Sequence, residues 1–284
     1  MNEIYSNHEE NQVSIRCAYV PEHMPDYFCS FSDAEHNLDE DITYYSQPGL
    51  VSIIGYPLCH DFSITGIENH VAGLVARLKP GSVKTISPVE LNIPGYRCKD
   101  IQNDFYSCLE LDKVAGNAKL RNMLKRASRD VYVSRTDSFT KEHLLLLSEF
   151  IRIKGFDRDK ATFFHRLPDY LARCERSMIF EARLHRNNSL AGYNVFDRGP
   201  GEYGFYLFNI TPEKFGRIPG LNDLLLEHAL NEIKCRGKRF MNMGLCVNKG
   251  IEKFKAKWGA TRFLPYYYQY FEPAFRWKTF FSRG

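Results

Sequence analysis

Apolar and polar positions along the chain follow two periods, one typical of strands and one typical of helices. Residues 50–56 form a nearly continuous apolar run that stops at Pro57, which predicts a buried strand. Residues 67–78 and 140–154 place apolar side chains three and four positions apart, which predicts helices. The helical segment 159–173 contains Pro168, so we expect it to form two shorter pieces.

Two distant parts of the chain predict the same order of elements. In residues 50–91, and again in residues 202–245, a strand leads through a turn into a helix and then into a short strand. Before the second of these helices, polar turns separate three strands, at 178–184, 190–197 and 203–209. Further strands are expected at 14–20, 42–46, 106–111, 131–135 and 260–270. The element order therefore predicts an α+β fold with two similar halves, although no sequence repeat relates them.

Residues 208–268 combine several features of an anion site. A turn that contains Arg217 and Gly220 precedes an apolar-periodic helix at 221–235. The start of a helix presents unpaired N–H groups and the positive end of the helix dipole, so it attracts phosphate. Gly220 lets the backbone approach a ligand, and Arg217 adds a guanidinium with the geometry that phosphate prefers. An ordinary loop with a solvated arginine explains the same residues, and this alternative stays open.

A second basic feature is the predicted helix at 117–129. Its apolar residues form one stripe, and Arg121, Lys125 and Arg129 form a cationic row with Arg126 beside it. Like charges four residues apart repel by a few tenths of a kcal/mol per pair unless an anion offsets them. The row is therefore either a surface for phosphates or a solvated helix face, and the sequence leaves both open.

Charge is distributed unevenly along the chain, although the net charge is only +4. Residues 1–112 carry a net charge of −11, whereas residues 113–284 carry +15. The excess of cations indicates an anionic partner for the second half, either nucleic acid, nucleotide phosphates or an anionic lipid surface. Alternatively, the two halves attract each other.

Several classes of protein find no support in the sequence. No run of about 18 apolar residues is present, so no membrane span is expected. The eight cysteines lack metal-ligand spacing, and the polar N-terminus lacks the pattern of a signal peptide. We therefore expect reduced cysteines in a cytoplasmic protein. Neither a zinc signature nor the spacing of a serine–histidine–acid triad appears, and no bound metal is expected.

The stretch 206–260, and the segment 254–260 in particular, resembles the second half of a tandem GNAT acyltransferase. Together with the basic helix within 116–129, it is similar to the FemAB-type aminoacyltransferases and the C-terminal domain of lysyl-phosphatidylglycerol synthase. This resemblance implies two GNAT-like halves, each a mixed, mostly antiparallel sheet flanked by helices. Residues 1–112 would be a degenerate half that shapes the substrate groove, and residues 113–284 would bind the cosubstrate.

The resemblance also implies an activity. FemAB-type enzymes take an acyl group from aminoacyl-tRNA, so this chain would move an aminoacyl group to an amine or hydroxyl acceptor. The acceptor would be a small molecule, a peptide or a lipid, with peripheral membrane contact through a basic face. Arg217-Ile-Pro-Gly220 would be the pyrophosphate loop, but the family turn contains more glycine, which weighs against coenzyme A. Two alternatives stay open: an N-acetyltransferase that uses acetyl-coenzyme A, and a non-catalytic protein that binds RNA or an anionic surface.

GNAT-type transfer requires little covalent chemistry from the protein, because the amine attacks the carbonyl directly. The protein must bind the phosphates of the carrier, orient the amine and stabilise the developing oxyanion. By resemblance, Lys255 would meet a tRNA phosphate or the carbonyl oxygen. Asn242 and Tyr206 are further catalytic candidates, and Tyr206 has core packing as its alternative. The remaining donor-binding candidates are Asn209, placed just after its strand, Lys257, and Trp258, which is either a base-stacking platform or a core residue.

Overall fold

The computed structural model describes residues 16–58, 63–114, 116, 118–212 and 218–274. The chain forms two compact units. Unit 1 combines the residues up to Asp33 with Tyr106–Phe263, and unit 2 combines Ala34–Phe105 with the residues from Leu264 onward. Within the described residues, no helix has the length and apolar character that crossing a membrane requires.

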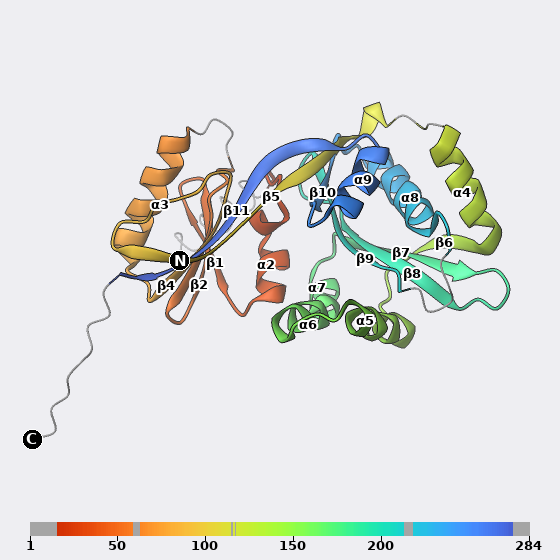
Figure 1. The fold of residues 1–284 in the computed structure, drawn as a ribbon, viewed down its shortest axis with the longest axis horizontal. Coiled ribbons are helices and arrows are strands. Elements are labelled where there is room, and N and C mark those ends of the chain that lie inside the picture. Colours follow the sequence, from red (N-terminus) through yellow and green to blue (C-terminus); the bar gives the residue numbers. More distant parts are fainter. Residues whose placement is uncertain (1–15, 59–62, 115, 117, 213–217, 275–284) are drawn as a thin grey trace, which may run out of the picture. The chain divides into compact units, whose positions relative to one another are not determined.

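Unit 1 is built on a mixed sheet in which all but one of the strand pairs are antiparallel (Figure 1). In order across the sheet, its strands are β5 (Tyr96–Glu110, with residues from Tyr106 in this unit), β10 (Phe240–Leu245), β9 (Tyr203–Ile210), β8 (Leu190–Asp197), β7 (Ser177–Leu184) and β6 (Val131–Thr136). The exception is the parallel pair β9–β10. This arrangement confirms the predicted run of three antiparallel strands before the second helix.

Helices cover both faces of this sheet. On one face lie α4 (Ala118–Asp130) and α8 (Leu221–Cys235), and α9 (Lys249–Lys257) lies on the same side (Figure 1). The opposite face carries α2 (Pro25–Phe31), α5 (Lys141–Lys154), α6 (Arg158–His165) and α7 (Leu167–Arg173). Short 3₁₀ turns, η1 (Pro21–His23) and η2 (Leu111–Lys113), complete the unit. Each face has its own hydrophobic core, so the sheet is buried on both sides.

Unit 2 contains a smaller mixed sheet with one helix packed on it. Its strands are, in order, β1 (Glu35–Asp39), β2 (Ile42–Gln47), β3 (Leu50–Ile54), β4 (Ser82–Ser87) and β11 (Thr261–Pro273). The parallel pair β3–β4 is connected by α3 (Ile64–Leu78), whose buried Ile67, Val71 and Leu74 join the core. Each unit therefore contains one strand–helix–strand crossover with parallel strands, as the repeated element order predicts.

Some sequence predictions are wrong in detail. Residues 16–20, within the strand expected at 14–20, form turns and irregular structure, and residues 14 and 15 lie outside the described part of the chain. Residues 21–41 show no periodicity, yet they contain η1, α2 and β1, because helices of three and seven residues are too short to display a pattern. Strand β5 begins ten residues before the predicted start. Its first half is polar and exposed, so it shows no apolar pattern in the sequence. A division of the chain after residue 112 into two GNAT-like halves is expected from the sequence, and this division stays a prediction.

Candidate functional site

Strands β9 and β10 stop pairing while both continue. Their parallel ladder runs from Tyr203–Phe240 to Phe205–Asn242, but β9 extends to Ile210 and β10 to Leu245. On its other side, β10 also shifts register against β5 between Asn242 and Leu245. The second half of β9 is therefore released from β10 at the edge that leads to α8. A break of this kind lets a ligand meet backbone groups inside a sheet.

Helix α8 begins directly after Gly220, as predicted. Gly220 has a φ of 85°, in the left-handed region that favours glycine. A Cβ here would collide with the carbonyl oxygen of Met123 in α4 and lie 3.3 Å from the Cβ of Ala127. The glycine therefore lets the start of α8 lie directly against α4. Arg217, the predicted cationic partner of this turn, lies outside the described residues.

Three asparagines carry buried amide atoms that have no hydrogen-bond partner within the described part of the chain. In Asn194, which is fully buried, both amide atoms lack a partner, and in Asn209 and Asn222 the oxygen does. Asn194 and Asn209 are directly opposite in the β8–β9 ladder. They share the face of Gly192, where a Cβ would lie 3.4 Å from Leu221, the first residue of α8. Unpaired amides at a helix start suit a polar ligand.

The structure places Asn209 inside β9, so the prediction that it follows its strand is wrong. Asn194 and Asn222 were not predicted as site residues. An asparagine inside a strand would have been a signal, because asparagine is depleted in strands and costs energy when it is buried unpaired.

Lys257 and Trp258 both bind the carboxylate of Asp223. This aspartate lies in the first turn of α8 and is 3% exposed. Its Oδ1 lies 2.5 Å from Lys257 Nζ and accepts a hydrogen bond from Trp258 Nε1 at 3.0 Å. The two side chains therefore attach the end of α9 to the start of α8. The sequence does not reveal this role for Asp223, because an acidic residue in a first helical turn is common.

Tyr206 lies in the core below the same helix. Its ring stacks on Phe196, with ring centroids 5.0 Å apart. Burial, together with the nearby charge of Asp223, raises the pKa of the Tyr206 hydroxyl well above its usual value. The hydroxyl is therefore protonated at neutral pH.

Lys255 holds a buried positive charge at the end of β10. It is 3% exposed, and its Nζ donates to the carbonyl oxygens of Gly244 at 2.7 Å and Leu245 at 2.6 Å. Asn242 shapes the same end of the strand, since its Oδ1 accepts from the Gly244 amide and its Nδ2 donates to the carbonyl of Tyr19. Two predicted catalytic residues thus meet where the β9–β10 ladder stops. Asn248 caps α9 and so fixes the helix that carries Lys255.

The cationic row of α4 is exposed, as a phosphate-binding surface requires. Its predicted members are Arg121, Lys125, Arg126 and Arg129. None of the four forms an ion pair with a carboxylate that the structure describes. Gly220 contacts Met123 and Ala127 on the packed side of α4, so the helix that carries this exposed row also packs against the start of α8.

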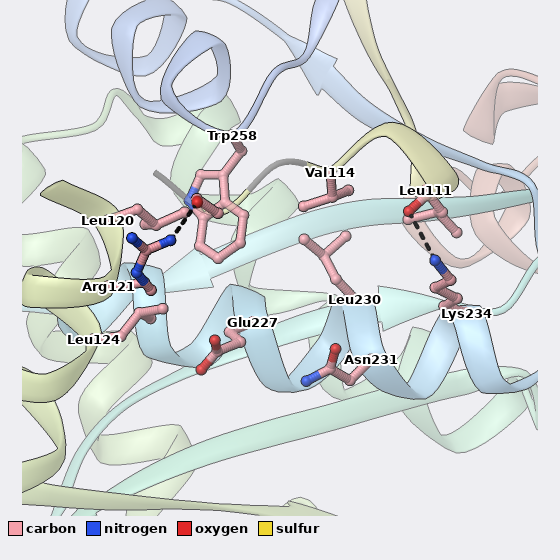
Figure 2. A pocket seen from close by; sticks show the side chains of 11 residues that line it. Leu111, Val114, Leu120, Arg121, Leu124, Glu227, Leu230, Asn231, Lys234 and Trp258 are labelled. Carbon is pink, nitrogen blue, oxygen red and sulfur yellow. Dashed lines mark hydrogen bonds between the residues drawn. The ribbon is translucent and has the colours of Figure 1, made fainter. Parts of the chain in front are cut away.

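A cavity of 240 Å³ lies between α4, α8 and the end of α9 (Figure 2). Arg121 belongs both to its wall and to the cationic row, and donates to the carbonyl of Gly116 at 2.7 Å. The remaining wall is largely apolar, and α8 adds polar groups to it. It consists of Leu111, Val114, Gly116, Leu120, Leu124, Glu227, Leu230, Asn231, Lys234 and Trp258. The cavity therefore offers a mixed surface next to the basic helix.

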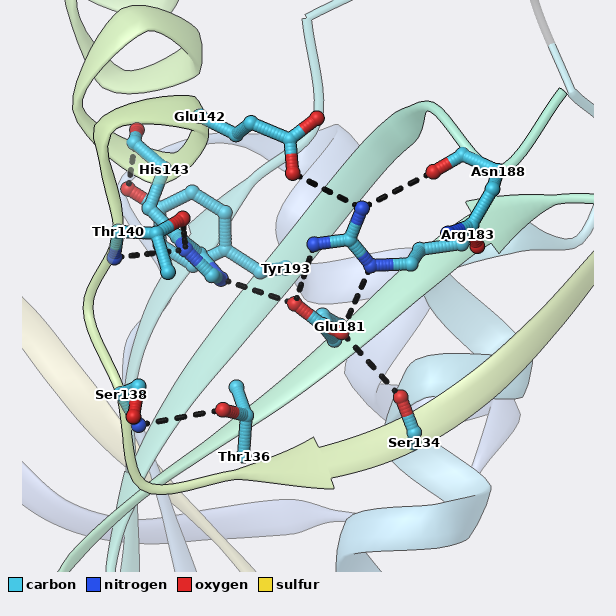
Figure 3. A network of polar contacts seen from close by, with 10 residues as sticks. All are labelled: Ser134, Thr136, Ser138, Thr140, Glu142, His143, Glu181, Arg183, Asn188 and Tyr193. Atoms are coloured by element: carbon cyan, nitrogen blue, oxygen red, sulfur yellow. Dashed lines mark hydrogen bonds and ion pairs between the residues drawn. The ribbon is translucent and has the colours of Figure 1, made fainter.

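A separate polar network connects α5 to the sheet of unit 1 (Figure 3). His143 is fully buried, accepts from the Thr140 amide through Nδ1, and points Nε2 at Glu181 Oε2, 3.3 Å away. Arg183 binds both Glu181 and Glu142. Burial lowers the pKa of His143, so the ring is neutral at pH 7. These groups bind one another, and we assign the network a structural role.

No protein-family profile and no curated protein sequence matches the chain. Solved structures do match its fold. They include the C-terminal domain of a protein described as a lysylphosphatidylglycerol synthetase from Agrobacterium fabrum, with a TM-score of 0.62, 14% identity and 92% of each chain covered. FemX matches with a TM-score of 0.63 and 12% identity over 91% of this chain and 95% of the other. A tandem GNAT protein from the clavulanic acid biosynthesis pathway matches with a TM-score of 0.51 and 12% identity, over 83% and 79%. The similarity confirms the predicted fold.

Proposed function

We propose that the protein is an acyltransferase that moves an aminoacyl group from aminoacyl-tRNA to an amine or hydroxyl acceptor. One observation carries the proposal: Gly220 lies against Met123 and Ala127, which joins the start of α8 to the cationic helix α4. A helix start alone suits a single phosphate group. A helix start that packs against a helix with a row of exposed cations suits a polyanion, whose backbone stays on the surface while its reactive end enters the protein.

The interior of unit 1 supports the chemistry. The reactive ester of the donor would lie where β9 and β10 separate, near the charge of Lys255. A fixed positive charge in a water-poor site stabilises the negative charge that develops on the carbonyl oxygen during attack. In the reaction the acceptor forms a bond to the carbonyl carbon, and the bond from that carbon to the ribose oxygen breaks.

The cavity beside α4 adds a place for a nucleoside. Arg121 faces both the cationic surface and the cavity, so a phosphate on this surface can lead its base towards the apolar walls around Leu120 and Leu230. Single-stranded nucleic acid is commonly bound by this combination of cations and apolar contacts. The terminal nucleotides of tRNA fit this description.

An acyl-coenzyme A donor is the second candidate. The unpaired Nδ2 of Asn194 in β8 is a hydrogen-bond donor, which would suit its pyrophosphate as well as a tRNA phosphate. The two donors differ in the number of phosphates beyond the reactive end, because tRNA is a long polyanion and coenzyme A is not. Only tRNA requires the row on α4.

Direct binding to α4 variants tests the proposal. We expect Lys125→Glu combined with Arg129→Glu to weaken binding of charged tRNA by at least 10-fold at 100 mM salt and to flatten its salt dependence by roughly two charges. The matched control is Lys141→Glu combined with Arg158→Glu, which reverses two exposed charges on the opposite face of the same unit. Equal binding by both double variants would contradict the proposal. Saturable binding of coenzyme A, with no tRNA binding, would favour the second candidate.

A further inference from the structure

The face of the unit 1 sheet opposite α8 carries a half-buried carboxylate, Glu22, in the turn η1. The hydroxyl of Tyr106 donates to Glu22 Oε2 at 2.7 Å. Tyr106 is fully buried in β5 and pairs with Leu245, whose carbonyl accepts from Lys255. Glu22 is thus connected, through one side chain, to the strand end that holds the lysine.

The turn that carries Glu22 is fixed to the point where the β9–β10 ladder stops. Asn242 Nδ2 donates to the carbonyl oxygen of Tyr19 at 2.8 Å, just before η1. Met24, directly after η1, packs in one core cluster with Phe205. Phe205 and Asn242 are the last pair of the parallel ladder. Two independent contacts therefore hold the segment around Glu22 at this pair.

Glu22 and the donor features lie on opposite faces of the sheet. Met241 and Met243 pack into the core below α8, so Asn242 between them points to the other face, where it meets Tyr19. The start of α8 and the cations of α4 are on the first face. A donor that enters from the side of α8 presents its carbonyl at the strand break, and an acceptor can approach it from the side of Glu22.

We propose that Glu22 is the general base of the transfer reaction. This inference rests on the acyl-transfer part of the proposed function. The carboxylate takes the proton that the attacking amine or hydroxyl loses as its bond to the carbonyl carbon forms. The carbon–oxygen bond of the donor ester then breaks, and the leaving ribose oxygen takes up a proton, which returns Glu22 to its ionised form.

The surroundings of Glu22 match this role. Burial raises its pKa to about 7, while the hydrogen bonds from Tyr106 and from the backbone amide of Glu22 act in the opposite direction. A carboxylate with a pKa near the working pH accepts a proton from an amine far better than an exposed glutamate, whose pKa is about 4.3. Tyr106 contributes in a second way, since its hydrogen bond orients the carboxylate.

The test compares Glu22→Gln with the wild-type protein in transfer assays across pH. Glutamine keeps the size of the side chain and accepts the hydrogen bond from Tyr106, but it cannot take a proton. We expect kcat at pH 7.5 to fall roughly 100-fold or more while donor binding is unchanged. The wild-type rate should rise through about pH 7, and this rise should be absent in the variant. Glu175→Gln, an exposed glutamate of the same unit, is the matched control and should behave as wild type.

Tyr106→Phe is a second test variant. A purely structural role for Glu22 would not explain its expected effect on the pH profile. The change removes a hydrogen bond that lowers the pKa of Glu22, so the rise in rate should shift to higher pH. Thermal unfolding of each variant verifies that it is folded.

The outcomes separate this inference from the proposed donor. Full kcat and an unchanged pH profile in Glu22→Gln would overturn the role of Glu22 and leave the proposed function in place. If the wild-type protein uses acyl-coenzyme A instead of charged tRNA, and Glu22→Gln is slow with it, the proposed tRNA donor is wrong but the proposed role of Glu22 is supported. A wild-type protein that transfers from neither donor would overturn both.

Discussion

Lys257 Nζ lies 2.5 Å from Asp223 Oδ1, and this ion pair attaches the end of α9 to the first turn of α8. The Asp223 side chain is buried, whereas the Lys257 side chain is 26% exposed. Trp258 Nε1 donates to the same oxygen. The start of α8, where we place the donor phosphate, is therefore fixed from one side by α9 and from the other by α4.

We expect Asp223→Asn to lower the free energy of unfolding by about 2 kcal/mol, because it leaves Lys257 without its counter-charge in a largely buried site. Denaturant unfolding measures the loss. Glu202→Gln is the control, since Glu202 forms an exposed ion pair with Arg239 and should cost less than about 0.5 kcal/mol. Equal effects of the two substitutions would contradict the structural role of Asp223.

Gly220→Ala should be destabilising for two reasons. The backbone has a φ of 85°, and the new Cβ would meet the carbonyl oxygen of Met123. Gly237 has a similar φ of 75° but open space around it, so Gly237→Ala isolates the backbone cost of about 1 kcal/mol. Because α4 must also move, we expect Gly220→Ala to lower the free energy of unfolding by about 2 kcal/mol more than Gly237→Ala does. Denaturant unfolding measures both losses. Equal costs would show that α4 does not pack against this turn.

Acid should destabilise the fold through His36. Burial lowers the pKa of this histidine to about 4, whereas in the unfolded chain it is near 6.5. The unfolded state therefore binds a proton first, and stability is lost as the pH falls from about 6.5 towards 4. His36→Gln should reduce this loss by about 2 kcal/mol, read as the difference between unfolding free energies at pH 7 and pH 4.5. His165→Gln, at an exposed site, should leave the pH dependence unchanged.

Glu22 should give the opposite pH dependence of stability to His36, with stability lost as the pH rises. Its pKa is raised in the folded state, so the stability it provides is complete below about pH 4.5 and is lost as the pH rises through about 7. Glu22→Gln should therefore stabilise the protein at pH 8 by about 2 kcal/mol relative to wild type, with a smaller difference at pH 5. A variant that is equally destabilised at both values would contradict the raised pKa. A residue that costs stability where it is ionised is typical of functional sites.

The sequence predicts the elements whose pattern is local and long. The apolar periodicity of 221–235 and the three strands before it appear in the structure as α8, β7, β8 and β9. A helix cap such as Asn248 is also a local feature, because capping depends on the next three residues. The resemblance to tandem GNAT proteins followed from these features, and it correctly indicated the fold.

The interior of the candidate site depends on contacts that no local pattern reveals. Glu22 meets Tyr106, which is 84 residues away, and the sequence shows only a short irregular segment around it. Asn194 and Asn209 become a pair through the register of β8 and β9. The family resemblance of segment 254–260 indicates Lys255, but its two carbonyl partners lie beside the register shift in β10, which the sequence does not show.

Transfer from charged tRNA tests the central claim most directly. Bulk tRNA that carries radiolabelled amino acids is incubated with the protein and a panel of amines, peptides and phospholipid vesicles, with and without prior ribonuclease treatment. We predict that label appears on an acceptor only when the protein and intact tRNA are both present. Label transfer that persists after ribonuclease treatment, or transfer that occurs only with acyl-coenzyme A, would contradict the account.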